Sequence, residues 1–330
     1  MRRFSTVIVM GLLFVLLSLP AAEAAAKFKM KLHTVGAETH ASVPSLREFK
    51  RYVEEKTGGD IEVSLHINAS LGGDRQAIEA MQLGTLEGGI VGGSIVAVFE
   101  PKFNVFEFPF LFNNHDAAIK FLDGPNGEIL DKELQKQDVR IIGWGVNGFR
   151  HISNNRGPIT KPDDLKGLKI RTMENPIHLS TFKLLGSNPT PMNFGELYTA
   201  LSQKTVDAQE NPVTLVYTSK FYEVQKYYSL TGHIYAVAPF AVSEIFFRQL
   251  PEEYQKVVIE AGKVYTDMER KLTFEEEDNM LAELRKNGME VNELSDAEKE
   301  VFKKQVMPVY DEFRDRVGDE LMNAVLKAND

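Results

Sequence analysis

The chain has 330 residues, no cysteine and a formal net charge of −9 at pH 7. The lack of cysteine excludes disulfides, thiol nucleophiles and cysteine-ligated metal sites. The acidic balance disfavours binding to nucleic acid and to anionic membranes, so an anionic ligand would have to be held by a local cluster of positive charge.

A pair of arginines opens the chain and precedes an apolar run from Val7 to Leu19. The alanine-rich stretch 21–26 then offers Ala-x-Ala cleavage sites, which is typical of a secretory signal peptide over residues 1–26. A membrane anchor would need about 20 apolar residues and would not normally end in such a stretch. We therefore expect an exported chain that begins near Lys27 and is not inserted in a membrane. Removing the segment removes two arginines and one glutamate, which moves the charge from −9 to −10.

The first part of the mature chain alternates between strand-like and helix-like segments. Asp74 can cap the second of the helices. Such alternation favours mostly parallel sheets covered by helices, and about 300 residues usually form two lobes. In chain order we expect strand 28–35, helix 43–55, strand 61–67, a helix opened by Asp74, and strand 88–91.

A second alternating unit begins after Trp144. It predicts a second α/β lobe. In chain order we expect strand 168–171, helices 176–185 and 194–202, and a short strand 206–209 before Pro212 opens another helical piece.

The C-terminal part predicts a long helix from Pro251 to the Asn287-Gly288 pair. About 36 residues at 1.5 Å each would span ~54 Å, more than the width of one lobe, so this helix would lie across both. Two helices with a break near Thr273 fit the sequence equally well. Ser295 with Glu298 predicts a capping box for the next helix.

Catalytic motifs are missing from the sequence. It contains no Gly-x-Ser-x-Gly elbow, no His-Glu-x-x-His and no phosphate loop. The seven histidines are scattered without metal-ligand spacing. We therefore expect no enzyme activity, no metal and no cofactor, although a composite site could still form in three dimensions.

Glycine pairs flank Ile90 and Val91. Such pairs can present backbone N–H groups to an anion, but a buried strand with tight ends is the favoured interpretation. The end of that strand leaves room for a ligand, with Ser94 available as a donor.

Arg171 closes the predicted strand 168–171, and a later segment carries the polar tetrapeptide 209–212. An arginine that ends a surface strand is usually solvated or weakly paired. At a cleft between lobes, its fork of donors could instead hold a carboxylate through two parallel hydrogen bonds, which lysine cannot match. Both interpretations stay open on the residues alone.

Four motifs occur in order along the second half of the chain, together with Gly73-Asp74-Arg75 in the first. They resemble the solute-binding proteins of tripartite ATP-independent periplasmic (TRAP) transporters, of the DctP type, over essentially the whole mature chain. The motifs cover residues 164–171, 189–201, 206–212 and 220–224.

The resemblance implies a two-lobed α/β periplasmic binding protein that closes on its ligand like a flytrap. Crossing strands would join the lobes and the long helix would pack along both. Lobe I would comprise residues 27–149 and 237–278, and lobe II residues 150–236 and 279–330. It also implies membrane permease subunits as partners and uptake driven by an ion gradient.

The same resemblance implies the ligand-binding residues. Arg171 would form a salt bridge with the ligand carboxylate, Asn211 would hydrogen-bond the ligand, and Phe194 would form an apolar wall. Some relatives use a second arginine at the first crossing between the lobes, which nominates Arg150 and, beside it, Asn147.

Arg150 has two possible roles. Two guanidinium groups in an empty cleft repel each other, and a dianion or one carboxylate held by both would relieve this repulsion. Alternatively, Arg150 could pair with Glu210, which would leave Arg171 alone for the ligand.

The first lobe would choose among acids. His40 follows the first strand, where family members often touch the ligand, although it could simply cap the next helix. Sialate-type relatives place an acidic side chain where this chain has Gly92 to Ser94, which disfavours a sialic acid. Trp144 follows apolar residues and fits a core better than the aromatic box of an ectoine-type site.

We therefore expect a periplasmic subunit that captures a small organic acid and delivers it to a membrane permease. A binding protein that feeds a sensor kinase would have the same pocket. An enzyme acting on sugar acids would need an acid–base pair or a metal in the cleft. C4-dicarboxylates, hydroxy or keto monocarboxylates, and uronic or aldonic acids all fit the sequence pattern.

Overall fold

A computed structural model describes residues 26–329. The predicted signal peptide lies outside this range apart from its last residue. Within the range, none of the helices combines the length and the apolar composition needed to cross a membrane.

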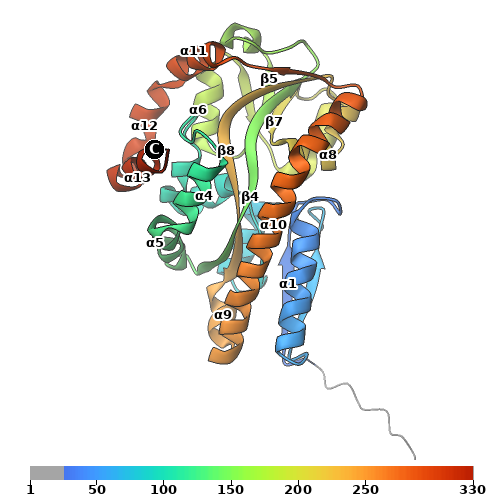
Figure 1. The fold of residues 1–330 in the computed structure, drawn as a ribbon, viewed down its shortest axis with the longest axis vertical. Helices are drawn as coiled ribbons and strands as arrows, with labels where there is room; N and C mark the ends of the chain where they lie inside the picture. Colours follow the sequence, from blue (N-terminus) through green and yellow to red (C-terminus); the bar gives the residue numbers. More distant parts are fainter. Residues whose placement is uncertain (1–25, 330) are drawn as a thin grey trace, which may run out of the picture.

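One mixed sheet runs through the whole molecule (Figure 1). Its order is β2-β1-β3-β8-β4-β7-β5-β6, with β9 paired to β8. The strands are β1 (Phe28–His33), β2 (Ile61–His66), β3 (Gly88–Ile90), β4 (Val139–Asn154), β5 (Lys169–Thr172), β6 (Asn188–Pro191), β7 (Ala208–Asn211), β8 (Tyr227–Ser243) and β9 (Glu290–Glu293).

The long antiparallel strands β4 and β8 connect the two ends of the sheet. At one end β1 pairs in parallel with β2 and β3, and at the other β5 pairs in parallel with β6 and β7. The predicted parallel pairing within each unit is confirmed. We call the end with β1–β3 lobe I and the end with β5–β7 lobe II.

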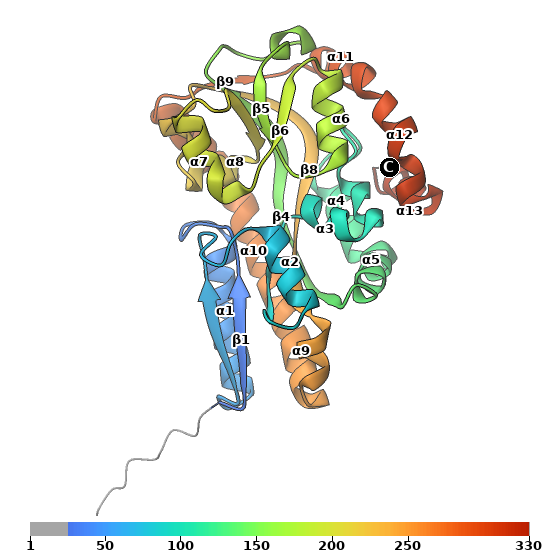
Figure 2. The same cartoon turned by 180° about the vertical axis from the view of Figure 1, so that it is seen from behind.

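Helices cover the faces of both lobes (Figure 2). Between the helices of lobe I and those of lobe II lie α4 (His115–Asp123), α5 (Pro125–Gln135) and the 3-10 turn η1 (Pro101–Phe106). Lobe I carries α1 (Ser42–Lys56), α2 (Asp74–Gln82), α3 (Gly93–Phe99) and α9 (Glu244–Gln249). Lobe II carries α6 (Pro176–Leu184), α7 (Phe194–Ser202), α8 (Val213–Thr218) and the 3-10 turns η2 (Pro162–Leu165) and η3 (Phe221–Glu223).

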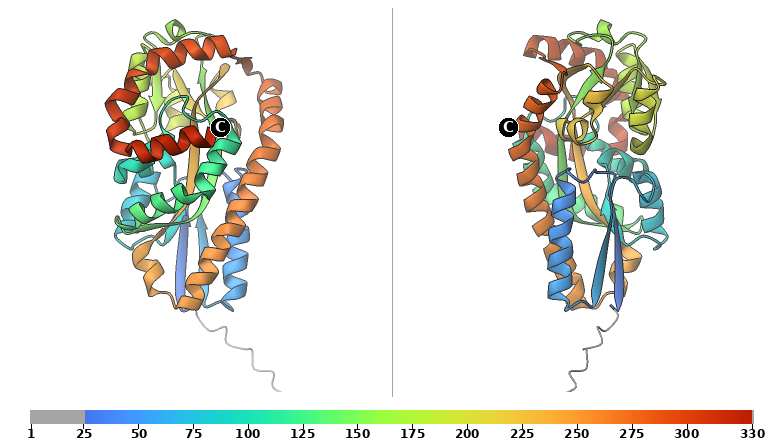
Figure 3. Two further views of the ribbon diagram at one scale, coloured as in Figure 1. Left: turned by 60° about the vertical axis from the view of Figure 1, so that its left-hand side comes forward. Right: turned by 90° about the vertical axis from the view of Figure 1, so that its right-hand side faces the viewer.

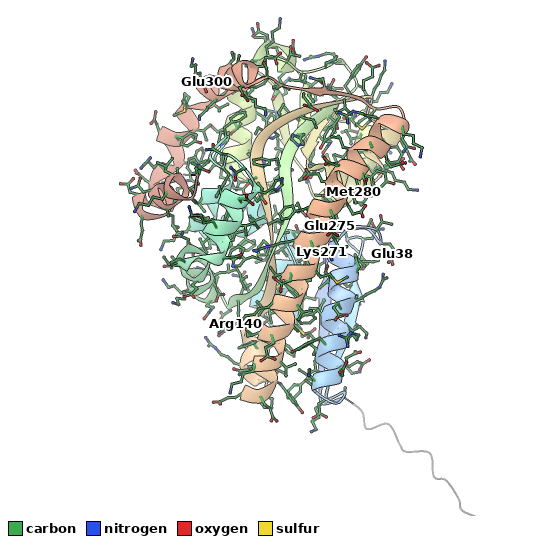
Figure 4. The ribbon with its side chains drawn as sticks, in the orientation of Figure 1. Glu38, Arg140, Lys271, Glu275, Met280 and Glu300 are labelled. Atoms are coloured by element: carbon green, nitrogen blue, oxygen red, sulfur yellow. The ribbon has the colours of Figure 1, made fainter. Side chains whose placement is uncertain are left out.

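The predicted long helix forms as one element, α10 (Glu252–Lys286), so the alternative break near Thr273 is wrong. Thr273 is buried, and its hydroxyl donates to Glu269 Oε1 over 3.0 Å. The helix packs against α1 in lobe I, along β4, and against α8 in lobe II (Figure 3). Figure 4 marks Lys271, Glu275 and Met280 in succession along it.

The chain ends in α11 (Asp296–Val306), α12 (Pro308–Val317) and α13 (Asp319–Asn329). The predicted capping box of Ser295 and Glu298 opens the first of these helices. The three helices contact α6 of lobe II as well as η1 and α4. They therefore cover a hydrophobic core that continues from one lobe to the other.

One predicted cap is wrong. Gly73 is the N-cap of α2, and Asp74 is its first residue. The Asp74 carboxylate instead accepts a hydrogen bond of 2.8 Å from the Gly92 backbone N–H and lies 3.2 Å from His33 Nε2. Its local position suited a cap, but a backbone donor from the β3–α3 turn binds the carboxylate.

Candidate functional site

A small cavity of about 50 Å³ lies between the lobes, where the strand ends of lobe I face β4, β7 and β8. Six of the seven residues nominated from the sequence line it. They are His40, Ser94, Asn147, Arg150, Phe194 and Asn211. A wider pocket of about 650 Å³ adjoins the cavity and shares Val35 and Phe194 with it.

Arg171 is the nominated residue that does not line the cavity, although its neighbours Met173 and Phe194 do. It is the third residue of β5 rather than its end, and it is 1% exposed. The surface interpretation of this arginine is therefore wrong. Its guanidinium carbon lies 6.0 Å from the centre of the Phe194 ring.

The Arg171 guanidinium is incompletely paired. Nε donates to the Met192 carbonyl over 2.9 Å, whereas buried Nη1 has no hydrogen-bond partner among the described residues. Burial lowers the pKa of Arg171 to about 10, even though the charge of Glu210 opposes the shift. At neutral pH the group is still charged, so an unpaired buried donor is available to an anion.

Arg150, in contrast, has an internal partner. Its Nη2 donates to Glu210 Oε1 over 2.8 Å and to Asn211 Oδ1 over 3.2 Å, and its Nε donates to Glu210 Oε2. This is the two-pronged pairing that the sequence left as an alternative. Nη1 donates to no atom of residues 26–329, and Arg150 lines the cavity.

Glu210 is the centre of a buried charge network. His233 Nε2 lies 3.2 Å from Oε2. His178 Nδ1 lies 3.5 Å from Oε1, which is an ion-pair distance, but this second contact lacks hydrogen-bond geometry. Burial alone would raise the pKa of Glu210, but Arg150 and the two histidines hold it well below its usual range. The carboxylate is therefore ionised and neutralises Arg150.

His178 links this network to Glu107, because its Nε2 lies 2.6 Å from Glu107 Oε2. Burial favours neutral imidazole, yet the hydrogen bond with Glu107 and the charges of Glu107 and Glu210 outweigh it and raise the pKa of His178. The Ser94 hydroxyl donates to the same Glu107 oxygen over 2.6 Å. Its proton is already used, so the expectation that Ser94 is a free donor is wrong, although the oxygen can still accept.

Asn211 is also held in place. Its Oδ1 accepts from Arg150, its Nδ2 donates to Gln209 Oε1, and its backbone carbonyl accepts from the Tyr228 hydroxyl over 2.9 Å. Because β7 ends at Asn211, the side chain lies at the cavity edge of the sheet.

Three residues of this network, His178, His233 and Glu107, were not predicted from the sequence. Glu107 stands between Phe106 and Phe108, and a carboxylate within an aromatic run was a readable sign of a buried, paired acid. His178 gave no comparable sign, since only the packing of α6 brings it to Glu107. Trp144 packs against Phe103 at 5.9 Å between ring centres, as expected for a core residue.

Comparisons with known proteins agree with this geometry. The profile of bacterial extracellular solute-binding protein, family 7 (DctP), matches residues 32–316. The chain belongs to the DctP family of TRAP solute-binding proteins. Its fold is the two-lobed α/β fold of that family. The related proteins are solute-binding proteins rather than enzymes, and the family is periplasmic.

A solute-binding protein from Verminephrobacter eiseniae is 36% identical over 93% of this chain and 91% of its own length. Two crystal structures of DctP-type proteins are similarly close. A TRAP solute-binding protein from Polaromonas sp. JS666 bound to D-erythronate has a TM-score of 0.87 and 36% identity, covering 90% of this chain and 98% of its own. The sugar acid binding protein from Advenella mimigardefordensis in complex with galactonate has a TM-score of 0.88 and 35% identity, covering 92% and 98%.

Proposed function

We propose that this DctP-family protein is exported to the periplasm, captures a small hydroxylated monocarboxylic acid between its lobes and delivers it to membrane permease subunits. The observation that carries the proposal is the buried Nη1 of Arg171, which has no partner in the described part of the chain. The lobe boundaries expected from the sequence belong to the same proposal.

Charge pairing favours a monoanion. Arg150 is neutralised by Glu210, and His178 lies between Glu210 and Glu107. Arg171 is the buried arginine with no carboxylate within ion-pair distance among residues 26–329. One ligand carboxylate would therefore give this second buried arginine a partner. A second carboxylate would meet the Glu210 and Glu107 charges inside the same low-dielectric site.

Phe194 lies beside Arg171, is half-buried and lines both the cavity and the adjoining pocket. A shift of this ring would bring the ligand carboxylate against Nη1, and its return would cover the ion pair with an apolar wall. Arg150 Nη1 and Asn211 would hold the oxygens on the opposite side. The relatives bound to D-erythronate and galactonate support a polyhydroxylated acid.

A thermal-shift screen of organic acids on wild-type protein and on Arg171→Ala tests the proposal. We expect hydroxylated monocarboxylates to raise the melting temperature of the wild type and to leave that of Arg171→Ala unchanged. Arg47→Ala is the control, because Arg47 is an exposed arginine that pairs with Glu38 on the surface. Near wild-type affinity in Arg171→Ala would show that the anchor is elsewhere.

Delivery to a permease and signalling to a sensor kinase would use the same pocket. Co-purification of the ligand-loaded protein with TRAP membrane subunits would support transport. Recovery of the acid unchanged after incubation would support binding without catalysis.

A further inference from the structure

Two residues that line the cavity each carry a buried side-chain polar atom with no hydrogen-bond partner among residues 26–329. These atoms are His40 Nε2 and Asn147 Oδ1. His40 comes from the loop that leads into α1, and Asn147 comes from the crossing strand β4. Because buried polar groups are almost always paired, two orphans in one ligand cavity indicate that the ligand supplies the partner.

The hydrogen bonds of His40 fix which nitrogen carries its proton. Its Nδ1 accepts from the Ser42 backbone N–H over 3.3 Å and lies 2.9 Å from the Ser42 hydroxyl. An Nδ1 that accepts leaves the proton on Nε2. Burial lowers the pKa of His40 to about 4, and attraction between the ring and the adjacent Asn147 side chain only partly offsets this shift, so the ring is neutral at physiological pH. The two side chains are neighbours, but His40 Nε2 and Asn147 Oδ1 do not meet in hydrogen-bond geometry, so one ligand hydroxyl could pair with both. His40 therefore presents one N–H donor and no charge.

Asn147 is held by an irregularity of the crossing strands. The pairing of β4 with β8 shifts between Val146 and Gly148, which makes Asn147 the extra residue of a β-bulge. Gly148 has φ 87°, in the region that favours glycine. The Val146 backbone N–H donates to Glu269 Oε2 of α10 over 3.0 Å. This clamp fixes the backbone on one side of Asn147, which lines the cavity.

From these contacts we infer that His40 and Asn147 form a hydroxyl-recognition subsite, in which His40 Nε2–H donates to a ligand hydroxyl and Asn147 Oδ1 accepts from it. A hydroxyl group both donates and accepts, whereas a keto oxygen only accepts and a methylene does neither. The subsite would therefore select hydroxy acids over the corresponding keto and deoxy acids. This inference rests on the proposed function, because it assigns the part of the same acid that Arg171 does not hold.

Calorimetric titration of D-erythronate and its 2-, 3- and 4-deoxy analogues tests the subsite. We expect one deoxy analogue to bind the wild type at least about tenfold more weakly than D-erythronate, since it leaves both orphans unpaired. In His40→Ala and in Asn147→Leu, the dissociation constant of that deoxy analogue should exceed that of D-erythronate by about threefold or less.

Two further variants separate recognition from folding. His40→Gln keeps an N–H donor and Asn147→Asp keeps an acceptor, so each should retain more of the discrimination than the apolar variant at the same position. His66→Ala is the matched control, because His66 lies in lobe I on β2 and does not line the cavity. It should keep the wild-type ratio of the two dissociation constants.

The inference is overturned if all three deoxy analogues bind the wild type as tightly as D-erythronate, or if full discrimination survives in both apolar variants. Binding of succinate but not of D-erythronate would also overturn it while leaving the role of Arg171 standing. If no acid binds the wild type at all, the proposed function fails and the subsite fails with it.

Discussion

Arg150 and Glu210 form a buried ion pair in which two guanidinium nitrogens meet two carboxylate oxygens, at 3% and 0% side-chain exposure. This pairing determines what Arg171 can do. Two arginines lie at the cleft, but one is already neutralised, so the described part of the chain offers one buried arginine to an incoming acid.

Removing the Glu210 charge should destabilise the protein. Glu210→Gln leaves the buried guanidinium of Arg150 uncompensated, which typically costs about 3–5 kcal/mol. Chemical denaturation should show this loss, whereas the double variant Arg150→Met/Glu210→Gln should recover part of it. Exposed Glu300→Gln is the control. Equal stabilities of Glu210→Gln and the wild type would mean that the pair is not maintained in solution.

Arg171→Lys should bind the acid about tenfold or more weakly than the wild type. Lysine keeps the charge but loses the planar fork that can hold the ligand and the Met192 carbonyl together. Titration calorimetry measures the loss, and Arg47→Lys on the surface is its control. A lysine variant with full affinity would show that charge alone is sufficient.

Lobe closure should depend on the small size of Gly73. A Cβ atom there would lie 1.9 Å from Asn193 Nδ2, across the gap between the lobes. Asn193 cannot easily move away, because its Oδ1 caps α7 by accepting from the Gly195 N–H over 3.0 Å. We expect Gly73→Ala to weaken ligand binding about tenfold.

Asn193→Gly in the same chain should restore most of that affinity, since glycine is a tolerated N-cap and removes the clash. Small-angle scattering with ligand should show a less compact shape for Gly73→Ala than for the double variant. If Asn193→Gly brings no recovery, the effect of Gly73→Ala comes from the cap of α2 rather than from closure.

The contribution of Glu269 to stability should fall as the pH rises from about 4.5 to 7. Burial raises the pKa of Glu269 from its usual 4.5 to about 7. A carboxyl group that binds its proton more tightly when folded stabilises the fold most below pH 4.5, and this contribution is lost between about pH 4.5 and 7. Glu277, whose pKa burial also raises to about 7, adds to the same window.

Glu269→Gln should remove the Glu269 part of this dependence. At pH 8 the variant should be more stable than the wild type by up to about 3 kcal/mol, and the difference should shrink toward pH 4.5. Urea denaturation at several pH values measures it. A constant difference across that range would show that Glu269 keeps its usual pKa when folded.

Much of the fold could be predicted from the sequence, because the relevant forces are local. Apolar periodicity defined the helices and strands to within a few residues, and Ser295 with Glu298 fixed the start of α11. The long helix was seen, but its continuity through Thr273 was not, since that depends on the packing of Thr273 against β4. The Asp74 cap failed for the same reason, because its competing partner, Gly92, is distant in the sequence.

The candidate site shows the same difference between what local sequence determines and what contacts between distant segments determine. The sequence alone determined which residues are available, namely two arginines, two asparagines, a histidine and an aromatic wall, together with the family to which they point. Only the tertiary structure decided that Arg150 is paired with Glu210, that Ser94 donates to Glu107, and that His40 and Asn147 are left without partners. The physical reason is that the role of a buried polar group depends on whether a partner lies within about 3 Å, and such partners come from strands and helices far apart in the chain.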